Sequence, residues 1–333
     1  MKTGNNKHLF LAGDIGATKT YIGLFDAGRK RPRLKVMEEF SSPEAPGLET
    51  IIMRFLHNHP ARIIAACFGI AGPVINGRCK TTNLPWDVSE RRLKKRFGWT
   101  RVRLVNDLIA TAMGLTVLPR RDLLSLNTAK PRKGQPVGLV APGTGLGQAL
   151  LAYDRGRRIP LASEGGHADF FPHTEAQARL WHYLHRQFGH VSLEMVLSGP
   201  GLVNIYRWLR DSGRYREPRW LAEALRNADP ARTITAAALE QNHPLCRAAL
   251  EMFISIFGAA CGNLALTAMT FGGVYLGGGI TPKILPELKK KNFMEAFTNK
   301  GCFKNILERI AVRVILNDKT ALLGAASAAL EMR

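Results

Sequence analysis

Residues 137–154 read VGLVAPGTGLGQALLAYD, and residues 8–26 read HLFLAGDIGATKTYIGLFD. Each stretch has an apolar run, a glycine-containing turn and a second run in which apolar residues recur, which is the pattern of a β-hairpin. Two hairpins of one plan suggest two related lobes. At 333 residues the chain is also long for a single compact core, so two lobes with a ligand cleft between them are expected.

The segments between and after the hairpins alternate between strand and helix patterns. The pattern predicts strands at 61–72, 102–105, 272–279 and 309–316, and helices at 90–98, 108–115 and 320–330. The strand at 102–105 is expected to deliver Asn106 and Asp107 into the helix that follows. Residues 175–271 are expected to be mostly helical. Such alternation indicates an α/β protein.

The GTGLG turn at 143–147 satisfies only part of a dinucleotide-binding fingerprint. That fingerprint needs glycines spaced G-x-G-x-x-G and a helix directly after the loop, whereas a strand pattern follows here. A Walker loop is also excluded, because no G-x-x-x-x-G-K-[ST] occurs in the chain. What remains is a hairpin turn whose backbone N–H groups are unobstructed and suited to cradle phosphate oxygens.

Two further glycine loops extend this interpretation. The first hairpin turns through Gly13-Asp14-Ile15-Gly16-Ala17-Thr18, in which Asp14 is suited to hold Mg²⁺ through water beside a polyphosphate. The GGGITP loop at 277–282 joins a strand to a helix, with Thr281 expected as the helix cap and Pro282 at the first helical position. Glycine there lets a flat base or ribose approach the backbone. For each loop taken alone, an ordinary turn stays the alternative.

Cysteine usage and the N-terminal sequence bear on the compartment. The five cysteines are scattered and form no C-x-x-C pair, which favours a reduced compartment and argues against a structural zinc site. The apolar run before Asp14 is too short for a signal peptide. A cytoplasmic location is therefore expected.

Residues 252–271 form an uncharged stretch of about the length that crosses a bilayer. The stretch contains Ser255, Asn263 and two threonines, lacks interfacial anchors, and runs directly into a strand pattern. We therefore expect a buried helix rather than a membrane span.

The net charge of +21 raises the question of a nucleic-acid or phospholipid surface. The basic clusters at 29–35, 91–103, 131–134 and 289–291 are dispersed, and no nucleic-acid-binding motif accompanies them. A solvated basic surface is the favoured interpretation, and nucleic acid is not expected as a partner.

Five motifs in order, GDIGAT (13–18), LVNDLIATA (104–112), PGTGLG (142–147), SEGGH (163–167) and LSGPGL (197–202), resemble those of the bacterial glucokinase family. The resemblance covers nearly the whole chain. It implies the two-lobed α/β fold of the actin and hexokinase ATPase superfamily, with a central cleft and in each lobe a mixed sheet flanked by helices. It further implies a small domain of residues 1–117 plus about 311–333, and a large domain of 118–310 that carries the sugar-binding loops and the long buried helix.

The same resemblance assigns roles to individual residues. Asp107 is implied to be the general base, and Asn106, Asp107, Glu164, His167 and Glu194 to bind the sugar. ATP is implied to contact three loops through the following residues: Gly13, Asp14, Ile15, Gly16, Ala17, Thr18, Gly143, Thr144, Gly145, Gly278 and Gly279. Asp107 as a helix cap and Glu194 as a partner of a helix dipole are the simpler alternatives. His167, between glycine and Asp169, is poorly placed for a core histidine.

Two further patterns bear on a possible zinc site. His182 and His185 stand one helical turn apart, but no third ligand lies at zinc-site spacing, so a surface helix is expected. The cysteine-rich zinc motif of the related repressor, open-reading-frame and kinase family is not found, which favours the glucokinase branch.

The first loop departs from the common family pattern GDxGGTN, because Ala17 and Lys19 replace its second glycine and its asparagine. Ala17 disfavours a positive φ, so we expect the turn to differ or to be strained. Lys19 is expected either to add a charge near the phosphates or to point to solvent.

The resemblance implies a glucokinase that transfers the γ-phosphate of ATP, with Mg²⁺, to the 6-hydroxyl of glucose, and a homodimer. Loops and cation would supply positioning and charge stabilisation, and Asp107 would take the hydroxyl proton. Closure of the lobes would exclude water. A kinase for another hexose, a polyphosphate-dependent glucokinase and a non-catalytic sugar-sensing regulator stay open as alternatives.

Overall fold

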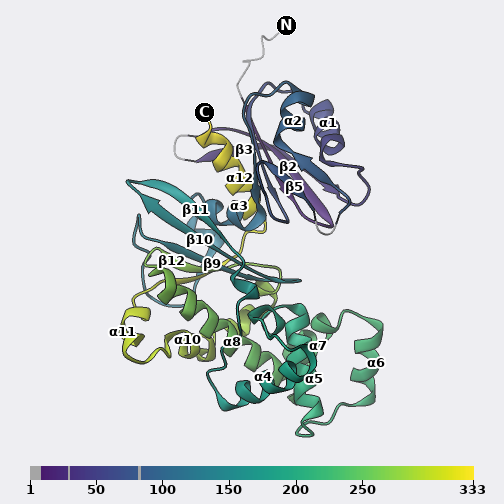
Figure 1. The fold of residues 1–333 in the computed structure, drawn as a ribbon, viewed down its shortest axis with the longest axis vertical. Coiled ribbons are helices and arrows are strands. Elements are labelled where there is room, and N and C mark those ends of the chain that lie inside the picture. Colours follow the sequence, from purple (N-terminus) through teal and green to yellow (C-terminus); the bar gives the residue numbers. More distant parts are fainter. Residues whose placement is uncertain (1–8, 29–30, 82–83) are drawn as a thin grey trace. The chain divides into compact units, whose positions relative to one another are not determined.

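The computed structural model describes residues 9–28, 31–81 and 84–333, and its Cα packing divides the chain into two compact units (Figure 1). Unit 1 comprises residues up to Leu123, the segment Pro160–Ala162, and Asn317–Arg333. Unit 2 comprises Leu124–Ile159 and Ser163–Leu316. Residue 8 of the first hairpin and the basic residues 29 and 30 lie outside the described ranges. Unit 1 therefore takes its described chain from both ends of the sequence.

Unit 1 is built on a five-stranded mixed sheet in the order β3-β2-β1-β4-β7. The predicted first hairpin is confirmed, because β1 and β2 pair antiparallel, whereas β1, β4 and β7 run parallel. The elements are β1 (Leu9–Ile15), β2 (Lys19–Ala27), β3 (Pro32–Ser41), α1 (Leu48–Asn58), β4 (Ile63–Ile70), β5 (Arg78–Lys80), β6 (Asp87–Ser89), α2 (Glu90–Phe97), β7 (Val102–Asn106), α3 (Asp107–Gly114) and α12 (Thr320–Glu331).

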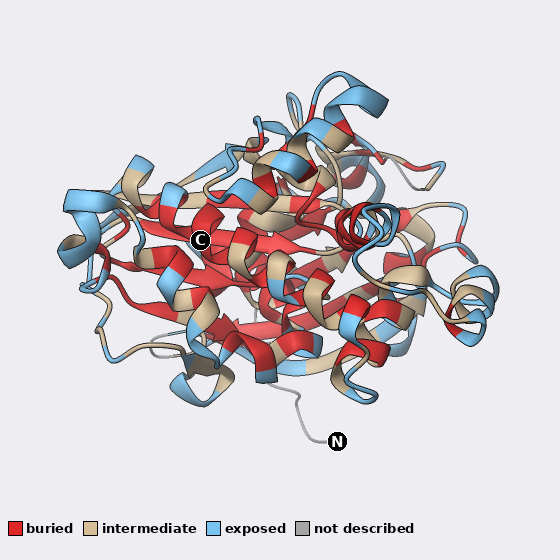
Figure 2. Ribbon diagram, turned by 90° about the horizontal axis from the view of Figure 1, so that it is seen from below, coloured by how far each residue is buried: buried red, intermediate tan, exposed pale blue. Residues whose placement is uncertain are grey.

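Side chains of the sheet alternate between its two faces, and each face has its own apolar core. Leu11 points with Ile15 toward α1 and α2, where Phe55 and Leu93 are fully buried. Phe10 points the other way, toward α3 and α12. The sheet is thus covered by helices on both faces. For the described chain in general, Figure 2 shows strands that are largely buried, in red, and helices with exposed turns in pale blue.

The helices α3 and α12 cross at two glycines. A Cβ atom on Gly324 would lie 1.7 Å from the carbonyl oxygen of Ala110, and a Cβ on Gly114 would lie 2.2 Å from that of Thr320. Only glycine permits backbones to approach this closely. The crossing fixes α3, and with it Asp107, against the C-terminal helix.

Asp26, at the end of β2, is buried in an ion-pair cluster. Its two oxygens accept hydrogen bonds from Nε (3.0 Å) and Nη2 (2.6 Å) of Arg33, and Nζ of Lys35 lies 3.1 Å from Oδ2. These hydrogen bonds, with that of Arg33 first, lower the pKa of Asp26 to about 2. Asp26 therefore contributes stability above its unfolded pKa, near 4, and loses it as the pH falls toward 2.

The variant Asp26→Asn should lower the free energy of unfolding by about 1 kcal/mol at pH 7, a value reduced because Arg33 and Lys35 face solvent. Urea unfolding at a series of pH values measures this difference. The gap between variant and wild type should close as the pH falls from about 4 toward 2. A gap that is independent of pH would show that packing, and not charge, is lost.

Unit 2 contains the second predicted hairpin, which is confirmed by the antiparallel pairing of β9 with β10. Its sheet has the order β11-β10-β9-β12-β13-β8, with β9, β12 and β13 parallel. The strands are β8 (Leu123–Ser125), β9 (Val137–Pro142), β10 (Leu146–Asp154), β11 (Arg157–Ser163), β12 (Gly273–Leu276) and β13 (Val312–Ile315). The helices are α4 (Glu175–Phe188), α5 (Gly199–Asp211), α6 (Arg219–Asn227), α7 (Pro230–Leu239), α8 (Pro244–Ala268), α9 (Leu285–Leu288), α10 (Lys291–Thr298) and α11 (Lys304–Leu307).

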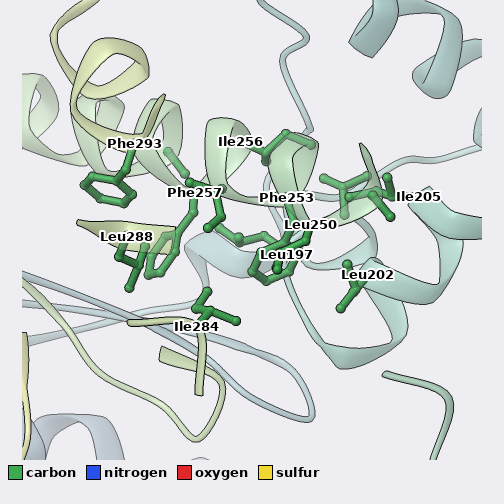
Figure 3. Close-up of a cluster of buried hydrophobic side chains, with 14 of the residues drawn as sticks. Leu197, Leu202, Ile205, Leu250, Phe253, Ile256, Phe257, Ile284, Leu288 and Phe293 are labelled. Carbon is green, nitrogen blue, oxygen red and sulfur yellow. The ribbon is translucent and has the colours of Figure 1, made fainter. Parts of the chain in front are cut away.

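The long apolar helix α8 forms the centre of the unit 2 core. Phe253 and Phe257 are fully buried, and the ring of Phe257 packs edge-on against Phe293 of α10 at 5.4 Å between centroids (Figure 3). Within the described ranges α8 is the one helix long and apolar enough to cross a membrane, but 72% of its most apolar window is buried in the structure. The prediction of a buried helix is confirmed.

Candidate active site

The first loop lies at the end of β1, and its turn is closed by backbone contacts. The N–H of Gly16 donates to the carbonyl of Lys19 (3.0 Å), and the hydroxyl of Ser42 donates to the carbonyl of Gly16 (2.8 Å). The N–H of Ser42 also donates to Thr18 O (3.0 Å). Gly13, Asp14 and Ile15 belong to the strand, whereas Gly16, Ala17 and Thr18 form the turn.

Of the two outcomes expected at Ala17, a different turn or a strained one, strain at a positive φ does not occur. Among the described residues other than glycine, positive φ occurs at Asn76, Arg155, Asn242 and Met269, and not at Ala17. The Gly16–Lys19 hydrogen bond closes the turn with ordinary φ angles, so alanine is accommodated. Lys19 reaches β3, where its Nζ lies 2.6 Å from Glu39 and this hydrogen bond raises the pKa of Lys19.

Asp14 and Asp107 come together at the carboxyl end of the parallel strands of unit 1. In the register of the sheet, Asp14 of β1 pairs with Gly69 of β4, and Asn106 of β7 pairs with Ile70 of the same strand β4. Burial, followed by the negative charge of Asp107, raises the pKa of Asp14 to about 7, against the opposing effect of Lys319. The edge of the sheet therefore holds two carboxylates whose repulsion a cation would relieve.

Asn106 is the N-cap of α3, so Asp107 is the first residue of this helix rather than its cap. The side chain of Asn106 accepts from the N–H of Leu108 (2.9 Å) and donates to the carbonyl of Gly72 (3.2 Å). Asp107 Oδ1 also accepts from Leu108 N (2.9 Å). The helix begins at Asp107, one residue before the predicted start, because Asn106 satisfies its first free N–H.

Lys319 is a residue of this region that the sequence analysis missed. It lies next to Asp318 (2.8 Å), sits 3.5 Å from the centre of the Tyr21 ring, and lowers the pKa of Asp14. The turn before α12 is held by Asn317, whose side chain accepts from Lys319 N (2.8 Å). Its polar sequence NDKT, directly after a predicted strand, is the signal that could have revealed it.

The glycine loop of unit 2, Gly143-Thr144-Gly145, turns between β9 and β10. The N–H of Gly143 donates to Gly145 O (2.8 Å), and Gly143 O accepts from the N–H of Gly199 at the start of α5 (2.8 Å). A Cβ on Gly145 would lie 2.6 Å from Oε2 of Glu194. The glycine therefore permits the close approach of Glu194 to this loop.

The third loop lies against the second. Gly278 has φ of +77°, and a Cβ there would lie 2.2 Å from the carbonyl oxygen of Pro142. The N atom of Gly279 is 3.9 Å from the position of a Cβ on Gly143. The predicted cap at Thr281 is wrong: a short 3₁₀ turn begins at Thr281 with Ile280 as its cap residue, because the Thr281 hydroxyl donates back to the carbonyl of Gly277.

A cavity of about 630 Å³ opens beside these two loops, entirely within unit 2. Gly143, Thr144 and Gly279 line one side. The N-terminal ends of α5 and α7 line another, each capped by a side chain, Ser198 and Asp229. The polar side chains of the cavity were not predicted from the sequence, because they lie on helices far apart in the chain. They are Asn204, Arg207, Arg232, Thr235 and Lys283.

The sugar-binding candidates of unit 2 lie on two 3₁₀ turns that contact each other. Glu164 precedes the turn Gly165–His167, and Glu194 lies in the turn Leu193–Met195. Gly166 packs on β10, where a Cβ would lie 2.1 Å from Leu146 O. Oε2 of Glu194 accepts from the N–H of Leu146 (2.7 Å). Glu164 and His167 are exposed side chains of this unit.

The predicted surface helix that carries His182 and His185 is α4, and both histidines are exposed on it. The ring of His185 stacks on Trp181 at 4.5 Å between centroids. Their positions agree with the surface-helix interpretation.

The chain is similar to known proteins over nearly its whole length. The family model described as Glucokinase matches residues 11–332. A glucokinase of Nostoc punctiforme is 38% identical over 96% of this chain and 98% of its own length, and one of Shigella sonnei is 37% identical over 94% of each.

Solved structures agree with the fold. The crystal structure of a glucokinase from an Antarctic psychrotroph superposes with a TM-score of 0.87 at 27% identity, covering 97% of this chain and 99% of the other. A glucokinase of the repressor, open-reading-frame and kinase family from Streptomyces griseus, in complex with glucose and AMPPNP, has a TM-score of 0.65 at 21% identity and covers 97% and 99%, which shows the fold alone. With its glycine loops, its paired carboxylates and this similarity over nearly its full length, the chain belongs to the glucokinase family of enzymes.

Proposed function

We propose that this protein is an ATP-dependent glucokinase, which transfers the γ-phosphate of ATP to the 6-hydroxyl of glucose and releases glucose 6-phosphate and ADP. The observation that carries the proposal is Asp107 beside Asp14 at the carboxyl end of the unit 1 sheet, in a chain that belongs to this family. Phosphoryl transfer needs positioning and charge stabilisation more than covalent chemistry, and the site is composed of groups that supply these.

Asp107 is the proposed general base. Its position at the start of α3 holds the carboxylate at a strand end, with Oδ1 tied to Leu108 N (2.9 Å). A base takes the proton of the attacking hydroxyl as the new P–O bond forms. Asn106, Glu164, His167 and Glu194 would hold the sugar hydroxyls. Oε2 of Glu194 already accepts from Leu146 N, so its Oε1 is the oxygen available to a hydroxyl.

The three glycine loops are the proposed binding groups for ATP. Gly13 to Thr18 in unit 1, and Gly143, Thr144 and Gly145 in unit 2, would donate backbone N–H groups to phosphate oxygens. Gly278 and Gly279 would lie against the nucleoside in the cavity beside them.

Magnesium fits the acidic end of the unit 1 sheet. Oxygen ligands suit Mg²⁺, which usually keeps several waters and takes one or two carboxylates. Asp14 meets this description, because burial, followed by the neighbouring charge of Asp107, raises its pKa and a bound cation would favour its ionised form. Within the described ranges no group of three or more acidic, His or Cys side chains forms a ready metal cage, which agrees with binding through water. When bound, Mg²⁺ neutralises charge on the phosphates.

One coupled assay tests the function. Purified protein with Mg²⁺, ATP and glucose should form glucose 6-phosphate, and removal of Mg²⁺ with EDTA should stop turnover. Parallel reactions with mannose and fructose, and with polyphosphate in place of ATP, distinguish the hexose and donor alternatives. No turnover with any pair would sink the enzyme proposal in favour of a sugar-sensing regulator. We also propose that the protein is cytoplasmic and forms a homodimer. Light scattering of the purified protein tests its oligomeric state.

A further inference from the structure

A second cavity, of about 560 Å³, lies within unit 1 at the end of the sheet where the parallel strands begin. Phe10, near the start of β1, and Ile64, near the start of β4, give it an apolar floor. Arg33, Arg101 and Arg333 line its sides, together with the buried Asp26. Its volume is in the range of sites for small molecules, roughly 300–1,000 Å³.

This cavity lies apart from the candidate active site of unit 1. Phe10 and Asp14 are on the same strand, four residues apart, which corresponds to about 13 Å. Likewise Arg101 directly precedes β7, whereas Asn106 ends it. A molecule in the cavity would therefore leave the carboxyl end of the sheet accessible.

The cationic side chains of the cavity are unequally paired. The guanidinium of Arg33 is engaged by both oxygens of Asp26, and Lys35 also contacts this carboxylate. Arg101 and Arg333, by contrast, form no ion pair with any residue in the described part of the chain. Glu331, the acidic residue in the last turn of α12, is close in sequence to Arg333 but already interacts with another group. Among the described residues, two guanidinium groups at one cavity thus have no anionic partner.

A phosphate group matches these arginines. A guanidinium presents a planar fork of N–H donors that suits phosphate oxygens, and such charge-assisted bonds are stronger than neutral ones. The apolar floor of Phe10 and Ile64 would contact a carbon skeleton rather than a second charge. We propose that this cavity is a binding site for a small organic phosphate, separate from the site of phosphoryl transfer.

Calorimetric titration with 3-phosphoglycerate tests this proposal without any need for catalysis, so its outcome is independent of the proposed function. The full-length protein, at fixed ionic strength, should bind 3-phosphoglycerate saturably. The double variant Arg101→Ala with Arg333→Ala should weaken binding at least tenfold, because it removes the two unpaired guanidinium groups. Thermal unfolding in the absence of ligand checks that this variant is folded.

The matched control is Arg91→Ala with Lys95→Ala, which removes two exposed charges from α2 and should leave the affinity within about twofold, since surface charges at a distance are screened. Glycerate, which lacks the phosphate, should not bind, and inorganic phosphate should bind more weakly than 3-phosphoglycerate. Binding should persist with saturating AMPPNP and glucose.

Four results would overturn the proposal: no saturable binding of 3-phosphoglycerate, equal weakening in both double variants, equal affinity for inorganic phosphate, or displacement by AMPPNP and glucose. The second would indicate general attraction to a basic surface. The last would place the ligand in the candidate active site instead.

Discussion

The variant Asp107→Asn should lower kcat for glucose phosphorylation by about 10²- to 10⁴-fold, the usual cost of losing a general base. Asparagine has nearly the same shape, and its Oδ1 can still accept from the N–H of Leu108, so the start of α3 should be preserved. What it lacks is the ability to take the hydroxyl proton. The loss should therefore fall on kcat, while KM for ATP changes little.

Steady-state kinetics with varied glucose and ATP measure this effect, and thermal unfolding checks the fold. Asp87→Asn is the matched control, because it makes the same chemical change in unit 1 at a carboxylate that pairs with Arg78 on β5. Its kcat should equal that of the wild type. A value of kcat for Asp107→Asn within threefold of the wild type would remove Asp107 from the role of base.

The variant Gly324→Ala should lower the free energy of unfolding of unit 1 by about 3 kcal/mol or more, at the upper end of what overpacking costs. The added Cβ would stand 1.7 Å from Ala110 O and 2.7 Å from Gly114 N, and both are backbone atoms that cannot rotate away. Relief requires α12 to separate from α3. Since α3 begins with Asp107, activity should fall along with stability.

Urea unfolding and soluble yield measure this second effect. Gly279→Ala is the control for stability, because a Cβ there meets no atom within 4 Å and its φ is not in the left-handed region. It should unfold within about 0.5 kcal/mol of the wild type, as is usual for substitutions away from packed sites. If Gly324→Ala unfolds like this control, the close crossing of the helices is not a feature of the protein in solution.

The hairpins, the core strands and the buried helix α8 could be predicted from the sequence, because each is a local pattern. The run VGLVAP becomes β9 with all six residues buried, and LFLAGDI becomes β1 with alternating faces. The start of α3 was predicted within one residue. The error there came from two adjacent residues that can both cap, Asn106 and Asp107.

What could not be predicted depends on contacts between distant segments. Strain at Ala17 was expected from the alanine alone, whereas the hydroxyl of Ser42, on the far side of β2, shapes that turn. Thr281 was predicted to cap a helix, but its hydroxyl instead donates a hydrogen bond to the carbonyl of Gly277. Lys319 reaches Asp14 across three hundred residues of sequence, and the cationic cavity of unit 1 combines Arg33, Arg101 and Arg333 in the same way. A local pattern such as NDKT can mark a residue as a candidate, but it does not encode which distant residue that side chain meets.

The composition of unit 1 from both ends of the chain has a consequence for biosynthesis. Its strands leave the ribosome before unit 2 does, but α12, which covers Phe10 and Ala12 on one face of the sheet, is synthesised only after unit 2. Unit 2 is nearly continuous from 124 to 316, so it can complete its core before α12 is available to cover the sheet of unit 1. Domains generally fold as units during synthesis, and exposed apolar surface invites aggregation. The strands of unit 1 therefore stay exposed to aggregation throughout the synthesis of unit 2, and residues 317–333 end that period.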